Sequence, residues 1–104
     1  MTEIHVQQGE SSVAVSVGDL VVVRLVEPGA TGYQWATDLV GDPVVEEFSR
    51  LQVEGADPAP GRSAARLVGL RAVGPGRAQV VFSLRRAWEK AEPVEVEHLR
   101  VDVT

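Results

Sequence analysis

The side chains that could carry out chemistry in this sequence are few and scattered. The chain has no cysteine, which excludes a thiol nucleophile, a thiolate zinc site and a disulfide framework. Its two histidines, His5 and His98, stand far apart, and neither belongs to a ligand-spaced pattern such as His-x-x-x-His. No serine lies on a nucleophile-elbow pattern; the serines are Ser11, Ser12, Ser16, Ser49, Ser63 and Ser83. We therefore predict that the protein is not an enzyme and binds no metal or cofactor.

Two other segments resemble chemical sites at first sight. One is an acidic run interrupted by Lys90, made of Glu89, Glu92, Glu95 and Glu97. A site of paired carboxylates is conceivable there, but we favour a solvated loop and strand face. The other is the Gly-Pro-Gly sequence at 74–76, which no helix follows to supply anion-binding amides, so we predict a hairpin turn and not a phosphate loop.

The residues best suited to recognition are aromatic. Trp88 lies in a charged connection, 85–93, beyond the regular alternation, and an exposed tryptophan in a loop usually marks a binding surface. Tyr33 and Trp35 share the parity of Leu39, so we expect them to be core anchors more than contacts. They follow a segment shaped by proline and glycine, which predicts a loop held between a stiff strand and two rings.

Composition limits the classes of partner. The chain of 104 residues is predicted to form one domain, 1–104, and its 44% apolar and 24% charged residues are ordinary for a globular protein. A net charge of -5 argues against a nucleic-acid partner and against an anionic membrane surface. No apolar run approaches the roughly 20 residues of a membrane span, and no signal peptide is visible. We expect a monomer when free, cytoplasmic unless a leader has been removed.

Apolar and polar residues alternate along most of the chain, which predicts β-strands. The expected strands cover residues 4–6, 13–17, 20–26, 33–39, 44–54, 65–73, 78–84 and 94–103. The expected inward-facing residues include Val13, Val15, Val17, Val21, Val23, Leu25, Tyr33, Trp35, Thr37, Leu39, Ala78, Val80, Phe82 and Leu84. Glycine and proline predict turns at 18–19, 41–43 and 74–76, and a long mobile loop at 55–63.

Two segments have an uncertain pattern. In 44–54, either Phe48 or Leu51, together with Val53, could supply the buried side, and 44–47 could instead form a helix. In 94–103, Val94 and Val96 have one parity whereas the later apolar residues have the other. One extra residue would keep both sets facing inward, so we predict a β-bulge or a strand break near 97–98.

Seven or eight short strands with regular turn signals indicate an all-β fold. We predict an immunoglobulin-like antiparallel β-sandwich without a disulfide, with Trp35 in the core position that this fold favours. A barrel of similar strand count is the alternative.

Three segments together resemble the chagasin-type inhibitors of papain-family cysteine peptidases. Residues 28–35, Pro-Gly-Ala-Thr-Gly-Tyr-Gln-Trp, are similar to the family motif Asn-Pro-Thr-Thr-Gly-Tyr/Phe-x-Trp. Residues 86–88, Arg-Ala-Trp, are similar to the family's Arg-Pro-Trp, and the Gly/Pro-rich 55–63 stands where the family has a glycine-containing loop. The order and spacing match over nearly the whole chain, although only the second threonine of the first motif is present, as Thr31.

The resemblance implies a reversible protein inhibitor of papain-like cysteine peptidases that blocks the active-site groove with loops around 28–32, 55–63 and 85–92. In this interpretation the loop with Thr31 covers the catalytic thiol, the loop with Trp88 lies on the primed side, and 55–63 lies on the non-primed side. The implied peptidase-binding residues are Pro28, Gly29, Ala30, Thr31, Gly32, Pro60, Gly61, Arg62, Arg86 and Trp88, with Tyr33 and Trp35 as loop anchors. The departures from the motifs leave one alternative, a non-inhibitory immunoglobulin-like protein-binding module.

Overall fold

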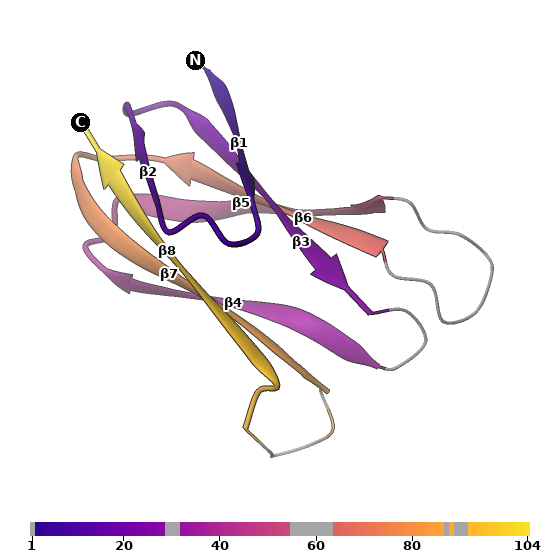
Figure 1. Cartoon of the computed structure of the whole chain (residues 1–104). Coiled ribbons are helices and arrows are strands. Elements are labelled where there is room, and N and C mark those ends of the chain that lie inside the picture. Colours follow the sequence, from indigo (N-terminus) through magenta and orange to yellow (C-terminus); the bar gives the residue numbers. More distant parts are fainter. Residues whose placement is uncertain (1, 29–31, 55–63, 87, 89–91) are drawn as a thin grey trace.

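The computed structural model describes residues 2–28, 32–54, 64–86, 88 and 92–104, with the backbone alone at 49–54 and 64. Eight strands are present: β1 (Glu3–Gln7), β2 (Ser12–Val15), β3 (Leu20–Glu27), β4 (Tyr33–Gly41), β5 (Val45–Glu54), β6 (Ala64–Ala72), β7 (Gly76–Arg86) and β8 (Glu95–Val103). They form two four-stranded sheets, in the orders β1-β3-β6-β5 and β2-β8-β7-β4, which Figure 1 shows as two layers. The predicted all-β sandwich is confirmed, and the fold is not a barrel.

Strand direction departs from a wholly antiparallel arrangement at one side of the sandwich. β1 pairs with β3 in parallel, and β2 pairs with β8 in parallel. The other pairs, β3 with β6, β4 with β7, β5 with β6 and β7 with β8, are antiparallel. The reason is that the chain crosses from one sheet to the other after β1, so that β1 and β2 become the edge strands of different sheets.

The core lies between the two sheets and follows the period of two. On β3 the side chains of Val21, Val23 and Leu25 are buried, and so are alternate residues of β7 from Ala78 to Leu84. These expected faces are confirmed. The expected burial fails at two strand ends, because Val17 lies beyond β2 and is 49% exposed, whereas Leu39 lies on the edge strand β4 and is 43% exposed.

The predicted bulge in the last strand is wrong. The register of β7 and β8 runs without interruption from Gly76 opposite Val103 to Leu84 opposite Glu95. Val94 and Val96 consequently face outward and are 62% and 42% exposed.

A glutamine explains why β8 keeps its register. The inward parity of Leu99 continues to Glu97, which is half-buried, and to Glu95, which is exposed. The Nε2 atom of Gln8 donates to both carboxylates, at 3.4 and 3.3 Å. The Oε1 atom of Gln8 accepts a 2.7 Å hydrogen bond from the backbone N–H of Val26, so this side chain links the two sheets. The acidic positions therefore have a polar partner, and no bulge is needed to turn them outward.

The bulges are in β5 instead. Its pairing with β6 shifts between Glu47 and Ser49 and again between Arg50 and Val53, so no single parity describes the strand. Phe48 is 50% exposed, and the Arg71 guanidinium lies 4.3 Å from the centre of its ring. The side chains of Leu51 and Val53 lie outside the described residues. The helical alternative for 44–47 is wrong, because Val44 and Val45 are buried and β5 begins at Val45.

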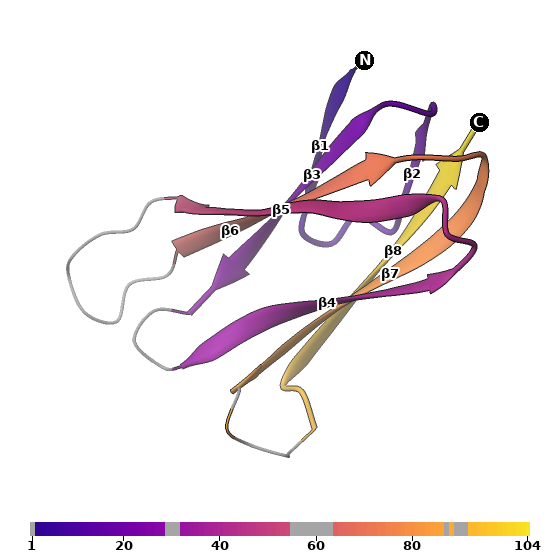
Figure 2. The same cartoon turned by 180° about the vertical axis from the view of Figure 1, so that it is seen from behind.

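The strand ends divide the molecule into two poles. Both termini lie at one pole, and the ends of β3, β5 and β7 lie toward the other, together with the starts of β4, β6 and β8 (Figure 1; Figure 2 gives the opposite view). We call this second pole the loop pole, because segments 28–32, 55–63 and 87–94 connect its strands. No helix in the described part of the chain is long and apolar enough to cross a membrane.

Candidate functional site

Gly32 and Trp88 bring two of the predicted recognition segments into contact at the loop pole. Gly32 has a φ of +80°, which an L side chain rarely adopts, and it directly precedes β4. A Cβ atom at this position would overlap Cη2 of Trp88 and would lie 3.0 Å from Cζ2 and Cζ3. The outer edge of the indole therefore rests on the glycine backbone. Trp88 is still 71% exposed, so most of its ring surface is available to a partner.

Tyr33 and Arg86 form a second contact between the same strands. They are register partners on β4 and β7, and the Arg86 guanidinium lies 4.6 Å from the centre of the Tyr33 ring. Such a cation–π contact is worth about 0.5–1 kcal/mol at an exposed site. Both residues are half-buried, and Tyr33 packs against the edge of the core. The end of β7 is thereby held to the start of β4, directly beneath the contact of Trp88 with Gly32.

Trp35, two residues after Tyr33 on β4, connects the two sheets. Its side chain is 2% exposed, as expected from its parity, and its Nε1–H donates a 2.8 Å hydrogen bond to the carbonyl oxygen of Val26. Val26 is on β3 in one sheet and Trp35 is on β4 in the other. A buried indole N–H needs a hydrogen-bond partner, and here the partner is on the other sheet. The bond therefore links the end of β3 to the start of β4.

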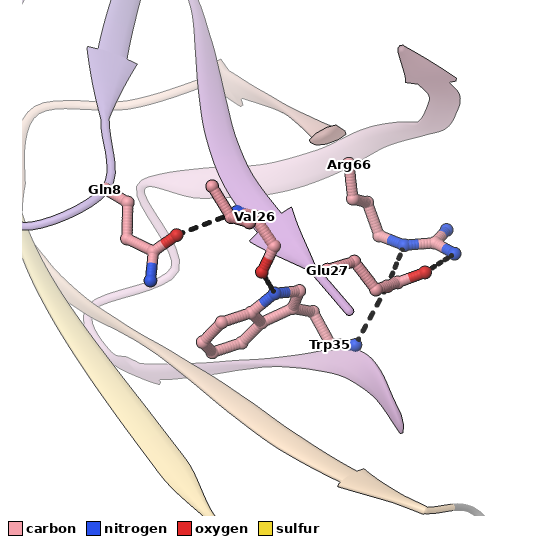
Figure 3. A network of polar contacts seen from close by, with 5 residues as sticks. All are labelled: Gln8, Val26, Glu27, Trp35 and Arg66. Carbon is pink, nitrogen blue, oxygen red and sulfur yellow. Dashed lines mark hydrogen bonds and ion pairs between the residues drawn. The ribbon is translucent and has the colours of Figure 1, made fainter. Parts of the chain in front are cut away.

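Glu27 and Arg66 form an ion pair beside Trp35, which Figure 3 shows with its neighbours. The Arg66 guanidinium donates through Nε and one terminal nitrogen to the two carboxylate oxygens of Glu27, at 2.6 and 2.9 Å. The backbone N–H of Trp35 donates to the same carboxylate at 3.4 Å. The hydrogen bond to Glu27 raises the pKa of the Arg66 guanidinium above its ordinary value, so the pair stays charged.

Sequence reasoning assigned no role to Glu27 or Arg66, although a signal was present. Glu27 continues the inward parity of Val23 and Leu25, and Arg66 continues that of Val68. A carboxylate and a guanidinium at core parity on two strands should have suggested a paired, partly buried site.

A comparison with protein families decides the identity of the chain. A family described as chagasin family peptidase inhibitor I42 matches residues 14–103. The chain belongs to the chagasin family of peptidase inhibitors.

Three solved structures share the fold of this chain. The cysteine protease inhibitor EhICP2 from Entamoeba histolytica superposes with a TM-score of 0.84 at 18% identity, over 99% of this chain and 96% of that one. PbICP-C, solved in complex with falcipain-2, gives 0.73 at 16% identity over 97% and 99%. Amebosin gives 0.69 at 18% identity over 98% of each chain. No curated protein matches the sequence.

Membership in the chagasin family makes the chain a peptidase inhibitor and not an enzyme, and it does not favour the alternative of a non-inhibitory binding module. In the described residues, no group of three His, Cys, Asp or Glu side chains could hold a metal ion. His5 lies 3.0 Å from Glu3 and His98 lies 3.4 Å from Gln79, both on exposed strand positions.

The structure describes only part of the chagasin-like site. The described site residues are Pro28, Gly32, Tyr33, Trp35, Arg86 and Trp88. The remaining implied contacts lie outside the described residues, and so does the expected mobile loop 55–63; these contacts are Gly29, Ala30, Thr31, Pro60, Gly61 and Arg62. The described residues bring the first and third segments together through Gly32 and Trp88.

Proposed function

We propose that this chagasin-family chain reversibly inhibits papain-like cysteine peptidases by placing segments 28–32, 55–63 and 85–92 in the active-site groove. The observation that carries the proposal is the exposed indole of Trp88 resting on Gly32, because it joins the two segments whose sequences match the family motifs. The complex of PbICP-C with falcipain-2 supports a cysteine peptidase as the partner.

The proposed mode of inhibition is occlusion of the groove. The chain has no cysteine and so offers no thiol of its own for exchange or covalent attachment. The segment with Thr31 would cover the catalytic thiol, with Trp88 on the primed side and 55–63 on the non-primed side. An interface of this type usually buries about 1,600 Å² in total, which a wedge of three segments can supply.

Preorganisation is the physical reason why this pole suits a tight inhibitor. Association costs about 0.5–1.5 kcal/mol for each rotamer-rich side chain that must be immobilised. Trp88 is already placed by Gly32, and Arg86 is already placed on the Tyr33 ring. Pro28 also fixes its own φ at the start of the first segment. Two residue types common at binding hot spots, tryptophan and arginine, therefore meet the partner with little further ordering.

An inhibition assay with papain tests the proposal. We expect inhibition in the nanomolar range, competition with a small peptide substrate, and full recovery of activity when the complex is diluted. Papain whose groove is filled by a covalent active-site reagent should no longer bind the chain. Absence of inhibition at micromolar protein, or undiminished binding to the blocked enzyme, would overturn the proposal.

A further inference from the structure

An ion pair occupies a position that the core pattern reserves for apolar side chains. Glu27 follows Val23 and Leu25 on the inward face of β3, and Arg66 lies opposite Leu25 on the inward face of β6. The side chains of Glu27 and Arg66 are only 12% and 17% exposed. On β3 and β6, the inward-facing apolar positions therefore give way to an ion pair at the loop pole.

The geometry of this layer joins three strands. Arg66 on β6 binds both carboxylate oxygens of Glu27 on β3, and one of these oxygens also accepts from the backbone N–H of Trp35 on β4 (Figure 3). The indole of Trp35 returns a hydrogen bond to Val26, the neighbour of Glu27. A bidentate pair of this kind fixes direction as well as distance, which an apolar contact does not.

The three strands are those that lead into or out of two proposed binding segments. Glu27 directly precedes segment 28–32, Trp35 follows that segment, and Arg66 follows segment 55–63 after two residues of β6. Stability alone does not account for the pair, because well-packed apolar residues of similar volume often replace a buried ion pair at no loss of stability. The directional link between the bases of the two segments does account for it.

We infer that Glu27 and Arg66 are positioning residues for peptidase binding, whose ion pair sets segment 28–32 relative to segment 55–63. The inference rests on the proposed function. Neither side chain needs to touch the peptidase, since both lie beneath the loop pole and are largely covered. Their effect is to fix the ends of β3, β4 and β6, from which the two segments extend, relative to one another, which lowers the ordering cost of the complex.

Replacement of the pair by apolar residues separates positioning from stability. In the double variant Glu27→Leu, Arg66→Met we expect a thermal midpoint near that of the wild type, and dissociation from papain about tenfold faster, with the association rate little changed. Glu27→Gln, a milder change, should also speed dissociation, because it leaves Arg66 without a charged partner. A matched control is Arg77→Gln, which breaks the 2.6 Å pair with Asp102 near the opposite pole and should leave dissociation unchanged.

Two outcomes would overturn the inference. One is wild-type dissociation in a correctly folded apolar variant; the other is equal acceleration by Arg77→Gln. If the wild type does not inhibit at all, the proposed function fails, and hydrogen exchange in the free protein still decides the inference. Faster exchange of the Gly32, Tyr33 and Trp35 amides in the apolar variant supports a positioning pair, and unchanged exchange contradicts it.

Discussion

At the scale of single residues, the site depends on a glycine whose value is its missing side chain. Gly32 combines a positive φ with a surface on which the Trp88 indole rests. Because glycine has no Cβ atom, it adopts the positive φ without strain. The missing Cβ also leaves room for the Trp88 ring. The contact covers one edge of the Trp88 indole and so restricts the rotamers that the ring can adopt.

The two properties of Gly32 can be separated by comparison with Gly9. Gly9 has a φ of +97° but nothing within 4 Å of its would-be Cβ, so Gly9→Ala introduces backbone strain alone. We expect both Gly32→Ala and Gly9→Ala to lower the free energy of unfolding by about 1–2 kcal/mol. Only Gly32→Ala should increase quenching of Trp88 fluorescence by acrylamide, since Trp35 is buried in both. Equal quenching in the two variants would mean that Gly32 does not place the indole.

At the scale of strands, the register of β8 places Val96 and Leu99 on opposite faces, one exposed and one buried. Val96 faces outward at 42% exposure, whereas Leu99 on the opposite face is 2% exposed. Val96→Thr should change the free energy of unfolding by no more than about 0.5 kcal/mol, and Leu99→Ala should cost about 2–5 kcal/mol. Denaturant unfolding measures both. A large loss of unfolding free energy with Val96→Thr would mean that Val96 is buried, as the predicted bulge requires.

The turn between β2 and β3 predicts an acid-sensitive element. The backbone N–H groups of Ser16 and Thr2 donate to the Asp19 carboxylate at 2.9 and 3.1 Å, with the Ser16 bond the larger cause, and lower its pKa from the ordinary 3.8. Because the folded state binds the proton less readily than the unfolded one, this contribution to stability is complete above about pH 4. It is lost as the pH falls through the lowered pKa.

The substitution Asp19→Asn tests this pH dependence. The variant should be less stable than the wild type at pH 7, and the difference should shrink as the pH is lowered below 4. Urea unfolding at a series of pH values gives the comparison. Asp102, whose pKa is lowered first by its hydrogen bond from Arg77, continues to titrate in both proteins and so cancels in the difference. A difference that stays constant down to pH 2 would contradict the assignment to Asp19.

At the scale of the whole molecule, the sequence predicted those features that depend on neighbours along the chain. The buried faces of β3 and β7 and the burial of Trp35 follow from local periodicity, and the structure confirms them. The hairpin predicted at 74–76 is wrong, because this segment joins β6 in one sheet to β7 in the other. The features it did not predict depend on contacts between distant segments. Gln8 satisfies carboxylates on β8 from the other end of the chain, and Glu27 finds Arg66 only after β3 and β6 have paired.

In the candidate site too, the sequence predicted the motifs but not the contacts between them. Family resemblance identified Gly32 and Trp88 from their motifs, yet their mutual contact required the fold. The parallel pairing of β1 with β3 and of β2 with β8 was not predicted either, because period-two patterns carry no information on which sheet an edge strand joins. The motifs of the loop pole can thus be recognised in short stretches of sequence. The polar contacts beneath them join residues far apart in the sequence and become visible only in the fold.

The inhibition constant of Trp88→Ala against papain, measured beside that of the wild type, tests peptidase binding through the loop pole most directly. We expect nanomolar inhibition by the wild type and a loss of about 2 kcal/mol or more, roughly thirtyfold, in the variant. Val17→Ala removes another exposed apolar side chain, near the termini, and should inhibit like the wild type. Inhibition by Trp88→Ala as strong as that of the wild type would contradict a peptidase-binding role for Trp88.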